Sequence, residues 1–318
     1  DWTKKCEALT NESYELINGD TYLCKDTFLS ASVSAGLVME ATRKVIRKHS
    51  KKEKKKYALT LNRPPGHHCD GHNSHGYCYI NNVAVSIDQV RHSINSKIKI
   101  LVLDVDIHHG DGTQKLFYCD PFVLTVSFHQ YDGVFYPCTG KRKEYGPSHL
   151  HEAFGTNINI PLYHDFTDYD MLYALRNVVW PIVEQFQPEL AFYAVGTDGV
   201  EGDLAGPDTR LTPLVFGQIC FELKQRCNKI VVVTEGGYTT SYLAEGFDSV
   251  LRALSGVGYN NVYSSSFTRL WVRPEMRKAV DFTRRDLKSK WNFPELIFDD
   301  SIYLLLCAFA FFIYMQKN

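Results

Sequence analysis

Residues 98–114 read IKILVLDVDIHHGDGTQ, and this stretch determines the fold that the sequence predicts. Its first half is almost continuously apolar, which favours a strand buried on both faces of a parallel sheet. Side chains alternate across a strand, so one face changes from hydrocarbon to Asp104, Asp106 and His108 at its carboxyl end. Because an unpaired buried carboxylate is costly, these groups need cations or strong donors. The stretch therefore predicts either a metal site, with zinc suited to the donors, or a structural Asp–His hydrogen bond.

The size and composition of the chain restrict what it can be. With 318 residues, 44% of them hydrophobic, it can bury the core of one large α/β domain or two smaller ones. A net charge of -1 gives no general attraction to nucleic acid, so we expect no direct nucleic-acid binding. Nine cysteines without a metal-ribbon spacing or a secretory signal indicate reduced thiols in a nuclear or cytoplasmic protein.

Strand and helix patterns alternate along the chain. Short apolar or β-branched runs predict strands at 57–61, 98–105, 123–128, 190–195 and 230–234. Helical spacing of apolar residues predicts helices at 30–49, 82–92, 169–186, 214–227 and 239–254. Residues 1–29 are expected to be mostly irregular, with some helix. This alternation predicts a single-domain α/β fold with a doubly wound, mainly parallel sheet and helices on both faces.

Polar segments follow each predicted strand, at the edge where ligands bind in such sheets. The five segments are RPPGHH (63–68), DIHHGDG (106–112), HQYDG (129–133), GTDG (196–199) and EGGY (235–238). Histidines, carboxylates, a tyrosine and glycines are thus delivered to one rim. The sequence predicts a single site there.

Longer segments carry a resemblance to a known family. They are DTYLCKDTF (20–28), RPPGHHCDGHNSHGYCYINNVAVS (63–86), LDVDIHHGDGTQ (103–114), VSFHQYDGVFYPCTG (126–140), QPELAFYAVGTDGVEGDLAG (187–206) and TEGGYTTSYLAEGF (234–247). In these segments the chain resembles the zinc-dependent histone deacetylases. RPPGHH, EGGY and DTYLC resemble class II, whereas VSFH and the aspartate of HHGDG resemble class I. The resemblance implies an arginase/deacetylase-like fold and removal of acetyl groups from lysine side chains of histones and other proteins.

The resemblance also implies the ions of the site. Asp106, His108 and Asp198 become ligands of one Zn²⁺, and three protein ligands leave the open position that a hydrolytic zinc needs. A monovalent cation, typically K⁺, is implied near the zinc. Its ligands would be Asp104, Asp106, His108, Ser127 and the backbone carbonyl of Phe128.

The catalytic residues follow from the same resemblance. His68 is implied as general base and then acid, oriented by Asp111, while His67 supports the transition state and is oriented by Asp104. A carboxylate at Asp111 is expected to make His68 more basic. Tyr238, after a Gly-Gly pair, would donate its hydroxyl to the acetyl oxygen as charge develops.

The substrate channel is implied at Tyr77 and Tyr136, next to Gly76, where most relatives carry two phenylalanines. Relatives that prefer acetylated polyamines have a glutamate where this chain has Ala205, which disfavours that substrate. Two alternatives stay open: a deacetylase of small acetylated amines such as polyamines, and a catalytically impaired scaffold of the same fold.

Other histidines and cysteines near these motifs have structural interpretations. His72 and His75 are expected at the surface, and His109 is expected to be structural because it points to the opposite strand face. Cys69 and Cys78 are expected to be packed thiols.

The ends of the chain differ from the family pattern. We expect a catalytic domain over 1–290 whose usual amino-terminal part is missing, followed by an atypical apolar tail at 291–318. Within the tail, the apolar run 302–315 is shorter than the roughly 17 residues that span a bilayer, so a membrane role is not expected. The basic run 51–56 is expected to be a solvated loop and not a localisation signal.

The expected partners are acetylated lysines of histone tails or other proteins and corepressor-type proteins, in chromatin and transcriptional repression. The expected location is the nucleus, the cytoplasm or both.

Overall fold

The computed structural model describes residues 2–9, 13–47, 56–206, 208–259, 261, 263 and 271–296. The apolar run 302–315 and most of the basic run 51–56 lie outside the described residues.

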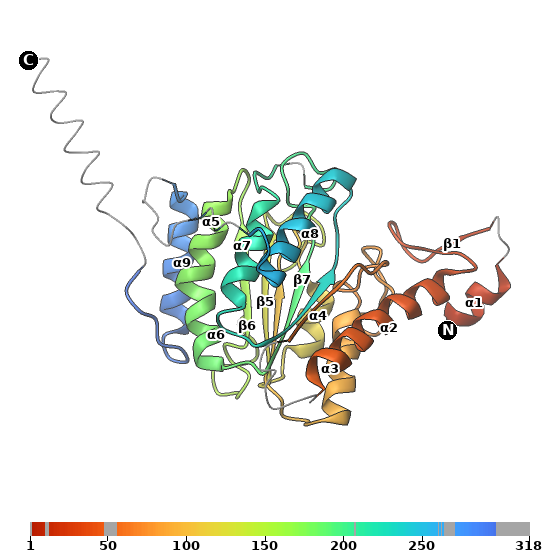
Figure 1. Ribbon diagram of the computed structural model, residues 1–318, viewed down its shortest axis with the longest axis horizontal. Helices are drawn as coiled ribbons and strands as arrows, with labels where there is room; N and C mark the ends of the chain where they lie inside the picture. Colours follow the sequence, from red (N-terminus) through yellow and green to blue (C-terminus); the bar gives the residue numbers. More distant parts are fainter. Residues whose placement is uncertain are drawn as a thin grey trace, which may run out of the picture.

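A six-stranded sheet lies at the centre of the described part of the chain (Figure 1). All of its strand pairs are parallel, and the strand order is β3-β8-β7-β4-β5-β6. The strands are β3 Lys56–Thr60, β4 Ile100–Asp104, β5 Val123–Gln130, β6 Asn157–Leu162, β7 Leu190–Val195 and β8 Lys229–Thr234. A small antiparallel pair, β1 Glu15–Leu16 with β2 Tyr22–Leu23, lies apart from the sheet. The predicted parallel α/β fold is confirmed.

The central strand β4 is buried along its whole length, and its two faces enter two different cores. Leu101 and Leu103 belong to one hydrophobic cluster, whereas Ile100 and Val102 belong to the other. This alternation was predicted from the apolar run. It places the polar groups that follow β4 at the junction of the two layers.

Helices cover both faces of the sheet (Figure 1). One layer consists of α2 Thr27–Ile46 and α3 Asn82–Ser93. The other consists of α5 Asp168–Ala174, a π-helical turn Leu175–Val179, α6 Trp180–Phe186, α7 Leu214–Leu223, α8 Thr240–Ser255 and α9 Pro274–Leu287. The short α4 Asp111–Phe117 follows β4, and α1 Trp2–Ala8 lies at the far end of α2.

The buried face of α2 includes only part of the apolar pattern that predicted this helix. Val33 and Leu37 belong to that pattern, but they are 52% and 48% exposed. The small residues Ala31, Ser34 and Ala35 face the core in the first half of α2, and the larger Val38, Val45 and Ile46 are buried in its second half. Ser34 donates a hydrogen bond over 2.7 Å to the carbonyl of Pro64, which places this part of α2 against the site loop.

Several described elements were not predicted, among them the short strands β1 and β2, the strand β6 and the helices α4 and α9. The edge strand β6 contains Pro161, which a strand tolerates at a sheet edge but which hides its pattern. The amphipathic α9 packs against α5 and β6, and α4 begins within the polar HHGDG segment. These elements extend the fold without changing its class.

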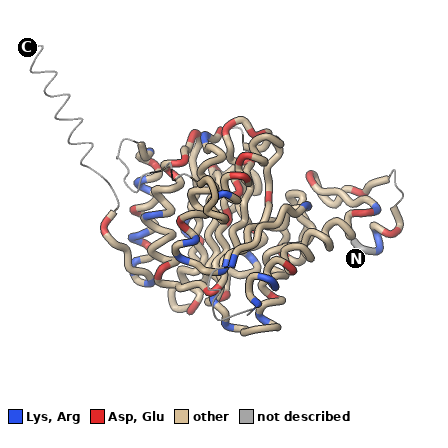
Figure 2. Tube along the Cα trace, in the orientation of Figure 1, with Lys and Arg blue, Asp and Glu red and all other residues tan. Residues whose placement is uncertain are grey.

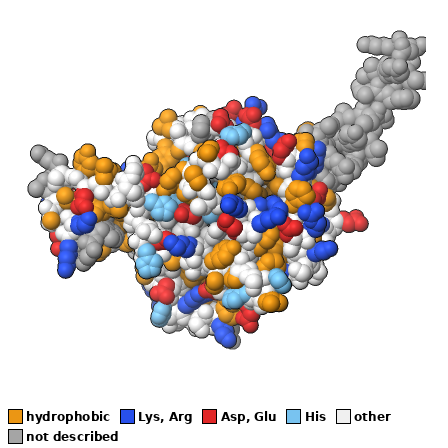
Figure 3. All heavy atoms as spheres, turned by 180° about the vertical axis from the view of Figure 1, so that it is seen from behind, with side chains coloured by type: hydrophobic (Ala, Val, Ile, Leu, Met, Phe, Trp, Pro, Cys, Tyr) orange, Lys and Arg blue, Asp and Glu red, His pale blue; other side chains and the backbone are white. Residues whose placement is uncertain are grey.

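The charges in the described part are mixed. Lys and Arg alternate with Asp and Glu along the trace (Figure 2), and the opposite side of the molecule shows both signs interspersed with hydrophobic side chains (Figure 3). Among the described residues, no helix combines the length and the hydrophobicity that crossing a bilayer requires.

Candidate active site

The carboxyl ends of β4 and β7 bring Asp106, His108 and Asp198 together. One ligand atom from each side chain lies within 4.8 Å of the others. The Nδ1 of His108 is 3.1 Å from Asp106 Oδ1 and 3.0 Å from Asp198 Oδ2. The two carboxylates are buried, and the side chain of His108 is 15% exposed. One imidazole and two carboxylates form a donor set that suits a divalent zinc ion.

Two glycines make room for this cluster. A Cβ on Gly196 would lie 2.0 Å from Asp106 Oδ2, and a Cβ on Gly236 would lie 2.4 Å from Asp198 Oδ2. The backbone N–H of Gly236 also donates to Asp106 Oδ2 over 2.7 Å. The backbone therefore approaches the carboxylates as closely as only glycine allows, and the residues present fit a bound metal ion.

The electrostatics of the cluster favour a cation. Burial opposes charge on His108, but the carboxylates of Asp106 and Asp198 outweigh burial and raise its pKa to about 10. Burial and the nearby Asp106 carboxylate raise the pKa of Asp198 to about 6. Two buried carboxylates repel one another, so positive charge between them stabilises the folded state.

Two adjacent histidines, each with a carboxylate partner, lie beside this cluster. His67 Nδ1 is 2.9 Å from Asp104 Oδ2, and His68 Nδ1 is 2.7 Å from Asp111 Oδ1. The two rings have centroids 4.0 Å apart, and the ring of His68 is 6.2 Å from that of His108. The expected pairings are therefore present in the structure.

The surroundings of the two histidines shift their pKa values in opposite directions. Burial alone would lower the pKa of His67, but Asp104 and Asp106 outweigh burial and raise it well above its ordinary value. Burial and the charge of His67 lower the pKa of His68 to about 4, although Asp111 acts in the opposite direction. The net effect on His68 is thus opposite to the basicity expected from Asp111 alone. Such a pair suits one charged and one neutral imidazole.

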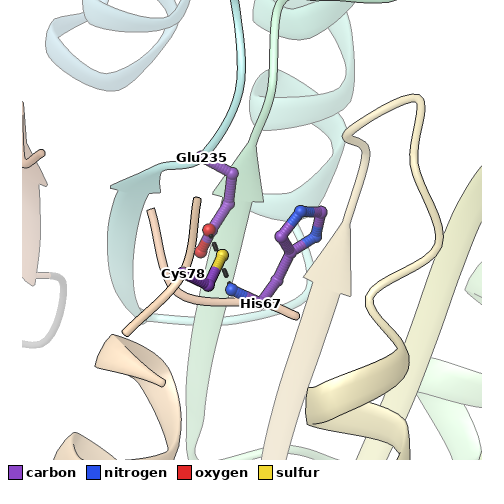
Figure 4. Close-up of side chains that lie close together, drawn as sticks. All are labelled: His67, Cys78 and Glu235. Atoms are coloured by element: carbon purple, nitrogen blue, oxygen red, sulfur yellow. Dashed lines mark hydrogen bonds between the residues drawn. The ribbon is translucent and has the colours of Figure 1, made fainter. Parts of the chain in front are cut away.

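Glu235 holds the loop that carries the two histidines, a role that the sequence did not indicate. Its Oε2 accepts hydrogen bonds from the backbone N–H of Gly66 over 2.7 Å and of His67 over 3.1 Å. His67, Cys78 and Glu235 also lie close enough together to be metal-ligand candidates. However, the imidazole of His67 points away from the other two side chains (Figure 4), toward Asp104. We therefore interpret this group as a backbone anchor.

Tyr238 follows β8 and is also anchored by its backbone. Asp203 Oδ2 accepts hydrogen bonds from the N–H of Tyr238 over 3.0 Å and of Thr239 over 2.8 Å. Burial, with the Asp198 and Asp106 carboxylates, raises the pKa of the Tyr238 phenol well above its usual range. The hydroxyl therefore remains a donor at neutral pH.

Of the residues expected in the channel, Gly76 and Tyr136 lie against His68, and Tyr77 lies against Tyr238. Gly76 has a φ of +55°, and a Cβ there would lie 2.3 Å from Cδ2 of His68. The ring of Tyr136 is 5.3 Å from that of His68 and 6.1 Å from that of His108. Tyr77 is 5.9 Å from Tyr238, ring to ring.

Some of the residues expected around a monovalent cation lie next to one another in the structure. Asp104 on β4 is directly opposite Ser127 on β5, and Asp104 Oδ1 accepts the N–H of Asp106 over 3.1 Å. Ser127 Oγ and Phe128 are buried, and Ser127 Oγ is 2.9 Å from Nδ1 of His129. The sequence had left His129 without a role.

Among the residues given structural interpretations, one was wrong. His75 was expected at the surface, but its Nε2 is 3.2 Å from Asp111 Oδ2 and its side chain is only 23% exposed. His109 is buried and bonded to Thr139 and Gln114, as a structural residue would be. No local pattern marks His75, because its partner Asp111 is distant along the chain.

Comparison with known proteins places these observations in a family. The histone deacetylase domain model matches residues 2–254. Histone deacetylase HDA1 of Candida albicans is 35% identical over 249 residues, which cover 76% of this chain and 29% of that protein. Histone deacetylase HDA1 of Saccharomyces cerevisiae is 32% identical over 306 residues, covering 91% of this chain and 42% of that protein.

A solved structure agrees with the sequence relatives. The crystal structure of the HDA15 HD domain superimposes with a TM-score of 0.78 at 26% identity, covering 91% of this chain and 76% of that chain. The present chain spans less than half the length of the two HDA1 relatives. The chain belongs to the histone deacetylase domain family.

Proposed function

We propose that this chain is a zinc-dependent hydrolase that removes acetyl groups from lysine side chains. The observation that carries the proposal is the convergence of Asp106, His108 and Asp198 beside two histidines, each paired with its own carboxylate. The family membership supports the same reaction.

Asp106, His108 and Asp198 would hold the zinc, and their burial restricts competing ligands. When bound, the zinc would supply a Lewis acid that polarises the acetyl carbonyl and lowers the pKa of a water molecule. The neighbouring group of Asp104, Asp106, His108, Ser127 and Phe128 would hold a potassium ion.

The proton transfers are assigned to the histidine pair. His68, kept neutral by burial and by the charge of His67, would take the proton of the attacking water at Nε2. The same nitrogen would then give that proton to the leaving lysine amine. Its Nδ1 donates to Asp111, which fixes the tautomer that this exchange needs. His67, whose pKa is raised by Asp104 and Asp106, would stay charged and stabilise the developing oxyanion.

Tyr238 would donate its hydroxyl to the acetyl oxygen in the transition state. Tyr77, Tyr136 and Gly76 would form the walls that guide the lysine side chain toward the histidines. The aromatic rings suit the lysine methylenes, and the glycine leaves space beside His68.

The proposed substrates are acetylated lysines of histone tails and of other proteins, with corepressor-type proteins as partners. This role fits a protein of the nucleus or the cytoplasm. Positively and negatively charged residues are intermixed along the described trace (Figure 2), and the sequence has a net charge of -1, so we expect no direct nucleic-acid binding.

The proposal is tested by incubating the zinc-loaded chain with an acetyl-lysine peptide and, in parallel, with an acetylated polyamine. We expect release of acetate from the peptide, inhibition by a hydroxamate, and much slower release from the polyamine. Preference for the polyamine, or no hydrolysis of either compound, would contradict the proposal.

A further inference from the structure

Asp111 contacts two histidines, one with each carboxylate oxygen. Oδ1 is 2.7 Å from His68 Nδ1, and Oδ2 is 3.2 Å from His75 Nε2. The rings of His68 and His75 are 5.3 Å apart and tilted by 32°. A histidine outside the proposed catalytic set therefore shares the carboxylate that orients the proposed general base.

His75 is itself held at its other nitrogen. Its Nδ1 is 2.6 Å from the hydroxyl of Tyr136. The Tyr136 ring lies edge-on to His68, with 5.3 Å between centroids and an angle of 85° between planes. A continuous chain of contacts thus runs from the channel residue Tyr136 through His75 and Asp111 to His68.

The backbone fixes His75 in this position. Its carbonyl accepts the N–H of Cys78 over 3.0 Å, and the next residue, Gly76, donates to Asp20 Oδ1 over 3.1 Å. The left-handed Gly76 allows this turn to lie directly on the ring of His68. Both the backbone and the side chain of His75 are therefore ordered by contacts at the site.

We propose that His75 is a positioning residue that, together with Tyr136, fixes Asp111 and thereby the orientation of the His68 ring. A carboxylate held at both oxygens cannot rotate about its terminal bond, so His68 keeps one hydrogen-bond geometry through the reaction. This inference rests on the proposed deacetylase reaction, and it deepens that proposal by adding His75 to its proton-transfer machinery.

Other charges around His75 are consistent with this role. Its hydrogen bond to Asp111 raises the pKa of His75, burial opposes the change, and the charges of Asp20 and Asp70 add to it. His68 Nδ1 and His75 Nε2 both lie at hydrogen-bond distance from the oxygens of Asp111, as a proton-linked network requires.

The kinetic test compares variants of the zinc-loaded protein with an acetyl-lysine peptide. His75→Ala should lower kcat about tenfold with little change in KM, as loss of an orienting partner does. His75→Gln should recover most of the activity, because its amide can still donate to Asp111. His72→Ala is the matched control, since His72 is an exposed histidine of the same loop and should leave kcat unchanged.

A double variant tests whether His75 affects turnover through Asp111 or independently of it. If His75 acts through Asp111, His75→Ala should cause no further loss in an Asp111→Ala background. The same tenfold loss in both backgrounds would overturn the proposal. Zinc content and urea unfolding of each variant verify that the fold and the metal site persist.

A second readout does not depend on turnover. The Nδ1 proton of His68, bonded to a carboxylate, should give a low-field proton resonance that is absent in His68→Gln. This resonance should shift in His75→Ala and in Tyr136→Phe but not in His72→Ala. An unmoved resonance in His75→Ala would overturn the proposal even if the wild-type chain proved inactive, in which case the proposed function fails separately.

Discussion

The carboxylate of Glu235 holds the backbone of His67: its Oε2 accepts the His67 N–H over 3.1 Å and the Gly66 N–H over 2.7 Å. Glu235 directly follows β8, so its hydrogen bonds fix the position of the histidine loop relative to the sheet. Glu235→Ala should therefore lower kcat by about tenfold or more, because misplaced catalytic groups are costly. Glu235→Gln keeps an acceptor oxygen and should retain most of the activity. Steady-state kinetics distinguish them, and equal losses in both variants would show that the acceptor is not what matters.

The hydroxyl of Tyr238 is expected to act only in the transition state. Tyr238→Phe keeps the ring and the backbone bonds to Asp203, and it should reduce kcat by about 100-fold, as removal of other oxyanion donors does. KM should change little. Tyr163→Phe, at an exposed tyrosine beyond β6, is the control. Turnover of Tyr238→Phe within a few-fold of wild type would reject the assigned role.

Alanine variants of Gly76 and Gly133 distinguish the effect of backbone strain from the effect of a new contact with His68. Gly76→Ala adds left-handed strain and also places a Cβ 2.3 Å from the ring of His68. Gly133→Ala adds the same kind of strain at a φ of +92°, but no atom lies within 4 Å of the new Cβ. Gly133→Ala should lose roughly 1 kcal/mol of stability. Gly76→Ala should lose more, because the contact with His68 adds to the strain. Only Gly76→Ala should lose turnover, and comparable activity of the two variants would show that the contact with His68 is unimportant.

A buried ion pair away from the site predicts how stability depends on pH. Glu222 accepts hydrogen bonds from Arg176, from Gln218 over 2.8 Å and from Trp180 over 2.7 Å. Burial opposes its charge, but Arg176 outweighs burial and lowers the pKa of Glu222 below its ordinary value. A carboxyl whose folded-state pKa is lowered contributes stability above its unfolded pKa, and that stability is lost as the pH falls.

Glu222→Ala should cost roughly 3 kcal/mol or more near neutral pH, because it leaves the Arg176 charge buried without this carboxylate. The difference from wild type should shrink below about pH 4, where the carboxyl becomes protonated even in the wild type. Glu184→Ala, which removes a 57% exposed partner of Arg226, is the control and should cost less than about 1 kcal/mol. Urea unfolding at several pH values measures the free energy of unfolding of both variants and of the wild type. A stability difference between Glu222→Ala and the wild type that does not change with pH would contradict the lowered pKa of Glu222.

Much of the fold was predictable because its signals are local. The apolar run of β4 fixed the parallel sheet, and the polar segments after successive strands indicated one rim. The pairing of His67 with Asp104 and of His68 with Asp111 followed only from the resemblance to the family. The structure brings these pairs within hydrogen-bond distance.

The features that the sequence did not predict depend on contacts between segments that are far apart in the chain. His75 has no local pattern, because its contacts are with Asp111 and Tyr136, which lie far away in the sequence. The direction of the pKa shift of His68 could not be inferred from Asp111 alone. Burial and the charge of His67 lower this pKa, and together they outweigh Asp111. The exposed Val33 on α2 shows the same limit, because helical spacing alone does not determine which apolar residues of a helix are buried.

The most direct test of the metal site is the zinc content of the purified chain, measured by elemental analysis. The convergence of Asp106, His108 and Asp198 predicts one zinc per chain in the wild type and its loss in Asp198→Ala. Asp208→Ala, at an exposed aspartate in the same β7–α7 connection, should keep the metal. A wild-type chain that binds no zinc, or an Asp198→Ala variant that binds it as fully as the wild type, would contradict the proposed metal centre.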